Sequence, residues 1–151
     1  MLIIKHSVNT IENLLVTPKE YGVEIDLRSY KNRIIINHEP FENGVDFLDW
    51  LKYYQHKFLI LNIKEEGLEK YILDIVNNQN IKDFFFLDQS MPFLIKTVLS
   101  GESRTALRVS EYESLETALK FKNKAKWIWV DFFSHFPLEI DDLNKLKNSN
   151  F

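Results

Sequence analysis

Short runs of apolar, β-branched and aromatic residues alternate with longer amphipathic stretches along the chain. Six of these runs are predicted to be strands: Leu2–His6, Val23–Arg28, Phe58–Lys64, Phe84–Asp88, Thr105–Val109 and Trp127–Phe132. Several are apolar almost throughout, as in Phe58-Leu59-Ile60-Leu61. This pattern is typical of strands that are covered on both faces in a parallel sheet.

The stretches between these strands carry helix signals. The apolar stripe Leu68, Ile72, Ile75 and Val76 predicts a helix from Glu66 to Asn78. Further segments are predicted as helices at Asp46–Gln55, between Ser90 and Gly101, at Leu115–Phe121 and at Leu143–Phe151, and as a short extended piece at Ile34–Asn37. The alternation predicts a parallel α/β fold with right-handed crossovers.

Two histidines and two carboxylates within the first 38 residues fit a single site. His6 ends the first predicted strand, Glu24 and Asp26 alternate along the second, and His38 follows the extended segment. Residues two apart on a strand share a face, so both carboxylates lie on one side, which is costly unless their charge is compensated. A divalent metal with two imidazoles nearby would make an acid–base centre.

Other polar residues also stand at predicted strand ends, where parallel α/β folds gather functional groups. They are Asn62, Lys64, Asp88, Arg108 and Asp131. Lys64 and Arg108 are candidates to bind a phosphate, or else to form ion pairs with the carboxylates at the same end. Strand ends are polar in any case, because the chain leaves the core there. Capping therefore remains an alternative for Asp88 and Asp131.

The remaining histidines, His56 and His135, are placed differently along the chain. His56 precedes a predicted strand, so it belongs at the opposite end and is predicted to be a solvated helix-end residue. His135 follows the last strand in an aromatic loop, where packing or capping is the favoured prediction.

Composition narrows the class of protein. The chain has 151 residues, 45% hydrophobic and 27% charged, which predicts one globular domain over residues 1–151. A net charge of −3 without basic blocks argues against nucleic acid. No apolar run is long enough to span a bilayer, no signal-peptide segment is found, and cysteine is absent. A cytoplasmic location is therefore predicted.

The order of these motifs resembles a known family. His6, Glu12-Asn13, the run Gly22-Val23-Glu24-Ile25-Asp26-Leu27 and the run Ile34-Ile35-Ile36-Asn37-His38-Glu39 are similar to the glycerophosphodiester phosphodiesterases and the wider phosphatidylinositol-phospholipase-C-like superfamily. The specific motifs cover about residues 1–65. The resemblance implies a (β/α) barrel of TIM type, a divalent metal (Mg²⁺ or Ca²⁺) and cleavage of a phosphodiester.

Carried over by position, the resemblance assigns roles to individual residues. His6 and His38 correspond to the catalytic histidines, Glu24 and Asp26 to metal ligands, and Lys64 to the lysine of a Glu-x-Lys strand. Four positions depart from the family pattern: Ser7-Val8 replaces Arg-Gly, Glu39 replaces an aspartate, and Asn62 replaces the third carboxylate ligand. An asparagine oxygen can ligate a hard cation without contributing charge.

The number of strands departs as well. A TIM barrel has eight strands in about 250 residues, whereas six strands are predicted here, so about six of the eight β/α units are expected. Such a sheet would be part of a longer protein, which is the favoured interpretation. The alternatives are completion by a partner or a second copy of the chain, and an open α/β sheet.

Together these observations predict a metal-dependent phosphodiesterase that acts on a small phosphodiester or a sugar phosphate by histidine acid–base catalysis. Glu24, Asp26 and Asn62 are the expected metal ligands, and phosphate contacts are expected from Lys64, Arg108, Asp88 and Asp131. Two alternatives stay open. One is a weakened or inactive relative that binds a ligand as an accessory protein, and the other is a sugar-phosphate enzyme of polysaccharide metabolism.

Overall fold

The computed structural model describes residues 1–149, and the chain divides into two compact units, Met1–Gln89 and the part from Ser90 onward. Each unit has its own hydrophobic core. The prediction of one domain over residues 1–151 stays a prediction.

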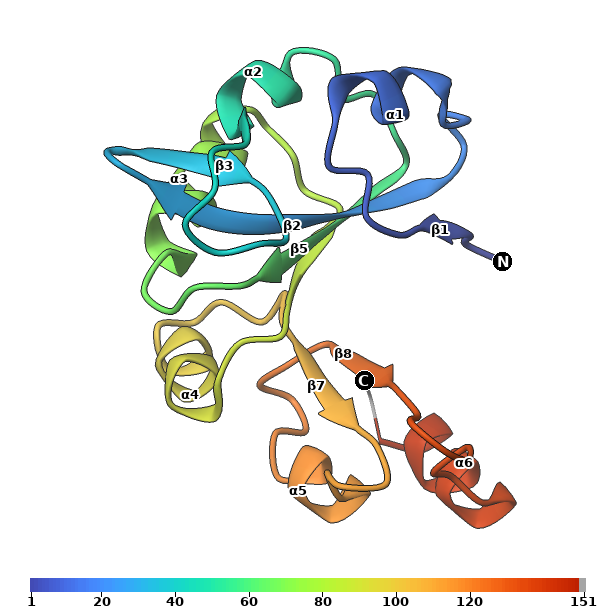
Figure 1. The fold of residues 1–151 in the computed structure, drawn as a ribbon. Helices are drawn as coiled ribbons and strands as arrows, with labels where there is room; N and C mark the ends of the chain where they lie inside the picture. The colour runs from blue at the N-terminus through green and yellow to red at the C-terminus, as the bar shows by residue number, and fades with distance from the viewer. Residues whose placement is uncertain (150–151) are drawn as a thin grey trace. The chain divides into compact units, whose positions relative to one another are not determined.

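The first unit is built on a mixed six-stranded sheet (Figure 1). Its strands run in the order β4-β3-β2-β5-β6, and β1 pairs with the first residues of β2. The elements are β1 (Ile4–Lys5), α1 (Ile11–Val16), β2 (Gly22–Tyr30), β3 (Arg33–Ile36), β4 (Val45–Asp46), α2 (Phe47–Leu51), β5 (Phe58–Ile63), α3 (Glu69–Asn78) and β6 (Phe84–Leu87).

The central strands β2 and β5 turn one face toward the helices. Val23, Ile25 and Leu27 of β2 belong to the same buried cluster as Leu59, Leu61 and Ile63 of β5, together with Leu14, Trp50, Ile72 and Val76 from the helical segments. Side chains alternate between the two faces of a strand. Glu24 and Asp26 therefore lie on the face opposite this core.

Gly22 allows β1 to approach β2 closely. A Cβ atom at this position would lie 2.2 Å from Ile4 Cδ1 and 3.0 Å from Phe58 Cβ, so a larger residue would require the Ile4 side chain to move and β5 to shift slightly. The parallel pairing of Ile4 with Gly22 brings the end of β1 beside β2. His6 and Ser7 follow directly, and they consequently lie next to the carboxylates of β2.

The predicted TIM-type barrel is wrong. In the described part of the chain the sheet is mixed and no closed barrel is present. The reason is local: a two-residue turn at Lys31-Asn32 reverses the chain, so that β3 pairs antiparallel with β2. Strand β1 pairs only with the first residues of β2, and β3 occupies the same edge of β2 farther along the strand. Strand β4 then extends the sheet antiparallel to β3.

The second unit contains a separate two-stranded parallel sheet. Its elements are α4 (Met91–Leu99), β7 (Ala106–Val109), α5 (Leu115–Leu119), β8 (Trp127–Val130) and α6 (Ile140–Lys147). Leu107 and Val109 of β7 pack with Leu94 of α4 and with Leu115 and Ala118 of α5. The helix predicted at Leu143–Phe151 begins earlier and ends at Lys147, and its last two predicted residues lie outside the described part.

Three other predicted helices are shorter than expected, and one of them, predicted at Leu115–Phe121, ends at Leu119. The segment predicted at Asp46–Gln55 is helical only over Phe47–Leu51, with Asp46 as its N-cap, and the helix predicted from Glu66 begins at Glu69. Within residues 1–149, none of the helices has the length and apolar character that crossing a bilayer requires.

Candidate functional site

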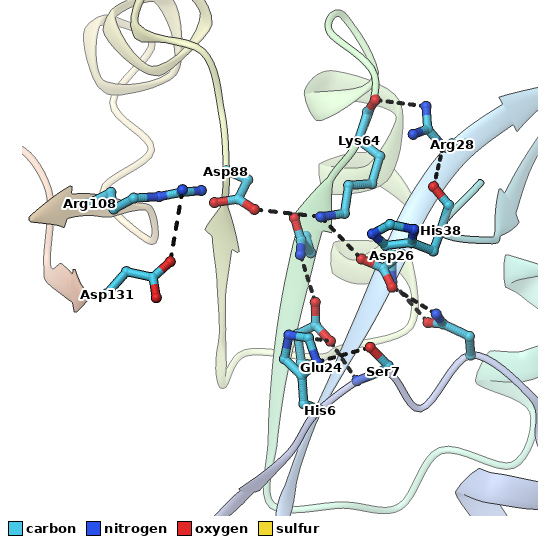
Figure 2. Close-up of polar contacts among 12 residues, drawn as sticks. His6, Ser7, Glu24, Asp26, Arg28, His38, Lys64, Asp88, Arg108 and Asp131 are labelled. Carbon is cyan, nitrogen blue, oxygen red and sulfur yellow. Dashed lines mark hydrogen bonds and ion pairs between the residues drawn. The ribbon is translucent and has the colours of Figure 1, made fainter. Parts of the chain in front are cut away.

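Glu24 and Asp26 of β2 form the centre of the candidate site. Their side chains are 0% and 1% exposed. Asn62 of β5 pairs with Asp26 across the parallel strands and is also buried, so the three side chains share one face of the sheet. Buried carboxylates require hydrogen-bonding or charged partners, and the structure supplies different partners to each of them (Figure 2).

Glu24 is held at both of its carboxylate oxygens. Asn62 Nδ2 donates to Oε1 at 2.7 Å, and the backbone N–H of Ser7 donates to Oε2 at 2.7 Å. Ser7 has a positive φ of 53°, an uncommon conformation for a residue with a side chain, which places its amide on the carboxylate. His6 Nε2 lies 3.5 Å from the same Oε2.

Asp26 is held by Asn9 and faces Lys64. The Asn9 carboxamide donates from Nδ2 to Asp26 Oδ2 at 2.7 Å and accepts the Asp26 backbone N–H at 3.0 Å. The other carboxylate oxygen, Oδ1, lies 3.4 Å from Lys64 Nζ. The charge that a metal was predicted to compensate is thus partly compensated by an ammonium group.

Lys64 contacts a second carboxylate, that of Asp88. Lys64 Nζ lies 3.6 Å from Asp88 Oδ2, and Asp88 directly follows β6 with a positive φ of 60°. The structure therefore brings Lys64 and Asp88 together as the sequence predicts. Their contact is the ion pair that was the alternative to phosphate binding.

Arg28 connects two of the predicted functional residues through their backbones. Its Nε donates to the carbonyl oxygen of His38 at 2.9 Å, and its Nη1 donates to the carbonyl oxygen of Lys64 at 2.9 Å. The guanidinium group thus ties the segment after β3 to the end of β5. The His38 ring is exposed, and its Nδ1 lies 2.7 Å from Glu39 Oε1.

Two buried oxygens of the cluster are candidate ligands for the predicted metal. Asp26 Oδ1 and Asn62 Oδ1 accept no hydrogen bond from the described residues. The Asn62 amide is oriented by Glu24, because the reverse orientation would direct its oxygen at a carboxylate. Asp26 Oδ1 and Asn62 Oδ1 are hard oxygen donors, of the kind that Mg²⁺ and Ca²⁺ prefer. Within residues 1–149, however, no group of three His, Asp or Glu side chains is arranged to hold a metal.

Arg108 and Asp131 belong to the second unit. Arg108 Nη1 lies 3.8 Å from Asp131 Oδ2, and Arg108 Nε lies 3.8 Å from Glu113 Oε2. The predicted roles of Arg108 and Asp131 in phosphate binding stay predictions.

Sequence reasoning missed the residues that orient the site. Asn9 was not predicted to belong to it, and Arg28, at the end of the predicted strand Val23–Arg28, was assigned no role, although it shares its strand face with Glu24 and Asp26. That alternation was the available signal for Arg28. Asn9 carries no comparable signal, because it lies in a loop and its contact with Asp26 spans 17 residues.

The prediction that His56 is solvated is wrong. His56 is buried, and its Nε2 lies 3.0 Å from the carbonyl oxygen of Thr17. His135 is exposed, and its loop is held by Glu111, which accepts the backbone N–H groups of Phe133, Ser134 and His135. These bonds, chiefly the one from His135, keep the pKa of Glu111 well below its usual range.

Comparison with known proteins adds no relative: no family model, no curated protein and no solved structure matches this chain. The resemblance to the glycerophosphodiester phosphodiesterases therefore depends on residues of the sequence alone.

Proposed function

We propose that the chain is a divalent-metal-dependent phosphodiesterase that acts on a small phosphorylated alcohol or sugar. The observation that carries the proposal is the contact between His6 Nε2 and the buried Glu24 carboxylate, 3.5 Å apart, beside Asp26 and Lys64 on one sheet face. This combination supplies an imidazole that can transfer protons, carboxylates that can hold a cation, and an ammonium that can bind a phosphoryl oxygen.

The charge of the cluster supports a metal requirement. Glu24, Asp26 and Asp88 bring three carboxylates, whereas Lys64 brings one ammonium, and the cluster keeps a negative formal charge even when Arg28 is counted. A phosphodiester would be repelled by this charge. A divalent cation held by Asp26, Asn62 and Glu24 would reverse its sign, neutralise the phosphate and favour ionisation of an attacking hydroxyl group.

His6 is suited to proton transfer by its surroundings. The ring is 65% exposed, so a substrate can reach it, while Glu24 on one side and Ser7 Oγ, 2.9 Å from Nδ1, on the other define its orientation. In the proposed reaction, one of His6 and His38 takes the proton of the attacking hydroxyl. The other protonates the leaving alkoxide, because an imidazole can donate a proton as well as accept one.

Hydrolysis of bis(p-nitrophenyl) phosphate and of glycerophosphodiesters tests this function. We expect turnover that depends on Mg²⁺, Ca²⁺ or Mn²⁺ and is abolished by a chelator. His6→Ala is expected to lose at least about 100-fold in kcat, the usual contribution of a general acid or base. His135→Ala removes another exposed histidine and is expected to retain full activity. Absence of hydrolysis under every metal, or equal rates for His6→Ala and wild type, would contradict the proposal.

A second candidate is a ligand-binding protein that has lost catalysis. It is favoured by the His38 ring, whose Nδ1 lies against Glu39, and by Asn62, which brings no charge to the metal set. Such a protein would be stabilised against thermal unfolding by a metal and a phosphodiester together, without forming a product. Product analysis over a panel of sugar phosphates separates both candidates from a sugar-phosphate enzyme.

A further inference from the structure

The ammonium group of Lys64 lies between two carboxylates. Its Nζ is 3.4 Å from Asp26 Oδ1 and 3.6 Å from Asp88 Oδ2, and both Lys64 and Asp88 are largely shielded from solvent. Both separations are typical of ion pairs and longer than those of charge-assisted hydrogen bonds. Lys64 thus compensates the charge of these carboxylates at ion-pair distances rather than at hydrogen-bond distances.

Two buried oxygens on the polar face of β2 and β5 have free coordination capacity. Asp26 Oδ1 and Asn62 Oδ1 are buried and accept no hydrogen bond within residues 1–149. Asn9 occupies the other oxygen of Asp26, and Glu24 holds the amide nitrogen of Asn62. Asp26 and Asn62, which are paired across β2 and β5, therefore each keep one side-chain oxygen that accepts no hydrogen bond.

We propose that Lys64 and a divalent cation compete for the oxygens of Asp26, Asn62 and Asp88. In this site Asp88, at the end of β6, supplies the carboxylate that Asn62 does not provide at the end of β5. The inference rests on the proposed metal dependence. It adds a ligand that the resemblance does not assign and a competitor for the metal.

The competition couples the metal to the substrate. Without metal, the Lys64 ammonium stabilises the buried Asp26 carboxylate. When a divalent cation takes these oxygens, repulsion between the two positive charges moves the ammonium away from them. Lys64 is then available to a phosphoryl oxygen of the substrate. A phosphate contact by Lys64 is thereby restricted to the metal-loaded protein.

Calorimetric titration of the full chain with Mg²⁺, Ca²⁺ and Mn²⁺ tests this competition. Lys64→Gln removes the competing charge and is expected to bind the metal at least about tenfold more tightly than wild type. Lys64→Arg keeps the charge and is expected to show no such gain. Asp88→Asn is expected to bind at least about tenfold more weakly. Lys52→Gln and Asp49→Asn are matched controls, because they break an ion pair on α2 and leave the cluster intact.

A measurement on the wild-type protein keeps the test independent of variant folding. Lysines labelled by reductive ¹³C-methylation give separate NMR signals, and the Lys64 signal is expected to shift on addition of metal while that of Lys52 does not. Unchanged metal affinity in a folded Lys64→Gln variant, or an unmoved Lys64 signal at saturating metal, overturns the competition.

The outcomes also separate this inference from the proposed function. Tighter binding by Lys64→Gln without any diester hydrolysis supports the competition and contradicts the phosphodiesterase. Metal-dependent hydrolysis with equal metal affinities in wild type and Lys64→Gln supports the phosphodiesterase and contradicts the competition. Absence of metal binding in every variant overturns both.

Discussion

The side-chain amide of Asn9 binds both the carboxylate and the backbone N–H of Asp26. Asn9 Nδ2 donates to Asp26 Oδ2 at 2.7 Å, while Asn9 Oδ1 accepts the Asp26 backbone N–H at 3.0 Å. A loop residue thereby fixes the rotamer of a strand carboxylate and leaves only one of its oxygens, Oδ1, to face Lys64. The site is consequently preorganised by a neutral residue that has no chemistry of its own.

Replacing Asn9 should destabilise the protein more than an ordinary loop substitution. Asn9→Ala leaves a buried carboxylate oxygen and a backbone N–H of Asp26 without partners, at an expected cost of about 2–4 kcal/mol in the free energy of unfolding. Denaturant titration measures it. Asn13→Ala, an exposed asparagine in α1, is the control and should change stability by less than about 0.5 kcal/mol. Equal effects of the two substitutions would show that the Asn9 contacts contribute nothing.

Arg28 is expected to order two segments of the site. Arg28→Ala removes the hydrogen bonds to the carbonyl oxygens of His38 and Lys64, so amide hydrogen exchange should accelerate in residues 37–39 and 64–66. Arg28→Lys should not rescue it, because a single ammonium group cannot reproduce the guanidinium fork. Arg33→Ala, in the adjacent hairpin, serves as the control. If exchange in these segments stays at the wild-type rate, Arg28 does not position them.

Replacing Glu24 should reduce the stability of the fold much more than replacing His6. Glu24→Ala leaves the Ser7 N–H and the Asn62 amide without their acceptor, and a loss of about 3 kcal/mol or more in stability is expected. His6→Ala removes an exposed ring and should cost less than about 1 kcal/mol. Thermal and denaturant unfolding measure both variants. A large destabilisation by His6→Ala would mean that its role is structural.

Glu111 should make the stability of the second unit depend on pH in the acid range. Because its pKa is lower in the folded chain than in the unfolded chain, its contribution is complete above the unfolded value and is lost as the pH falls below it. Glu111→Gln should therefore lower the melting temperature at neutral pH. The difference from wild type should shrink between about pH 5 and about pH 2. Glu20→Gln, an exposed carboxylate, is the control. A difference that is constant with pH would exclude this role for Glu111.

The polar face of β2 and β5 could be predicted from the sequence because it follows from strand alternation. Two-residue spacing places Glu24 with Asp26, and the parallel pairing of two apolar strands brings Asn62 and Lys64 beside them. The first relationship depends on residues close together in the chain, and the second depends on the rule that the carboxyl ends of parallel strands lie at the same edge of a sheet. The strands β2, β5 and β6 were predicted for the same reason.

The closed barrel could not be tested by such local patterns. A reversal of the chain at Lys31-Asn32 is readable from the sequence, but the turn alone does not say that the extended segment after it pairs with β2 in the same sheet. The burial of His56 likewise depends on the carbonyl oxygen of Thr17, 39 residues earlier in the chain. Contacts of this range are set by tertiary packing, and no periodicity in the sequence reports them.

Anomalous diffraction from crystals grown with Mn²⁺ tests the central claim, a cation-dependent site on β2 and β5, most directly. The account predicts a manganese peak within coordination distance of Asp26 Oδ1 and Asn62 Oδ1, with Lys64 Nζ moved away from Asp26. The same peak should be lost in Asp26→Asn crystals. A wild-type peak located elsewhere, or none at these oxygens at saturating Mn²⁺, would contradict it.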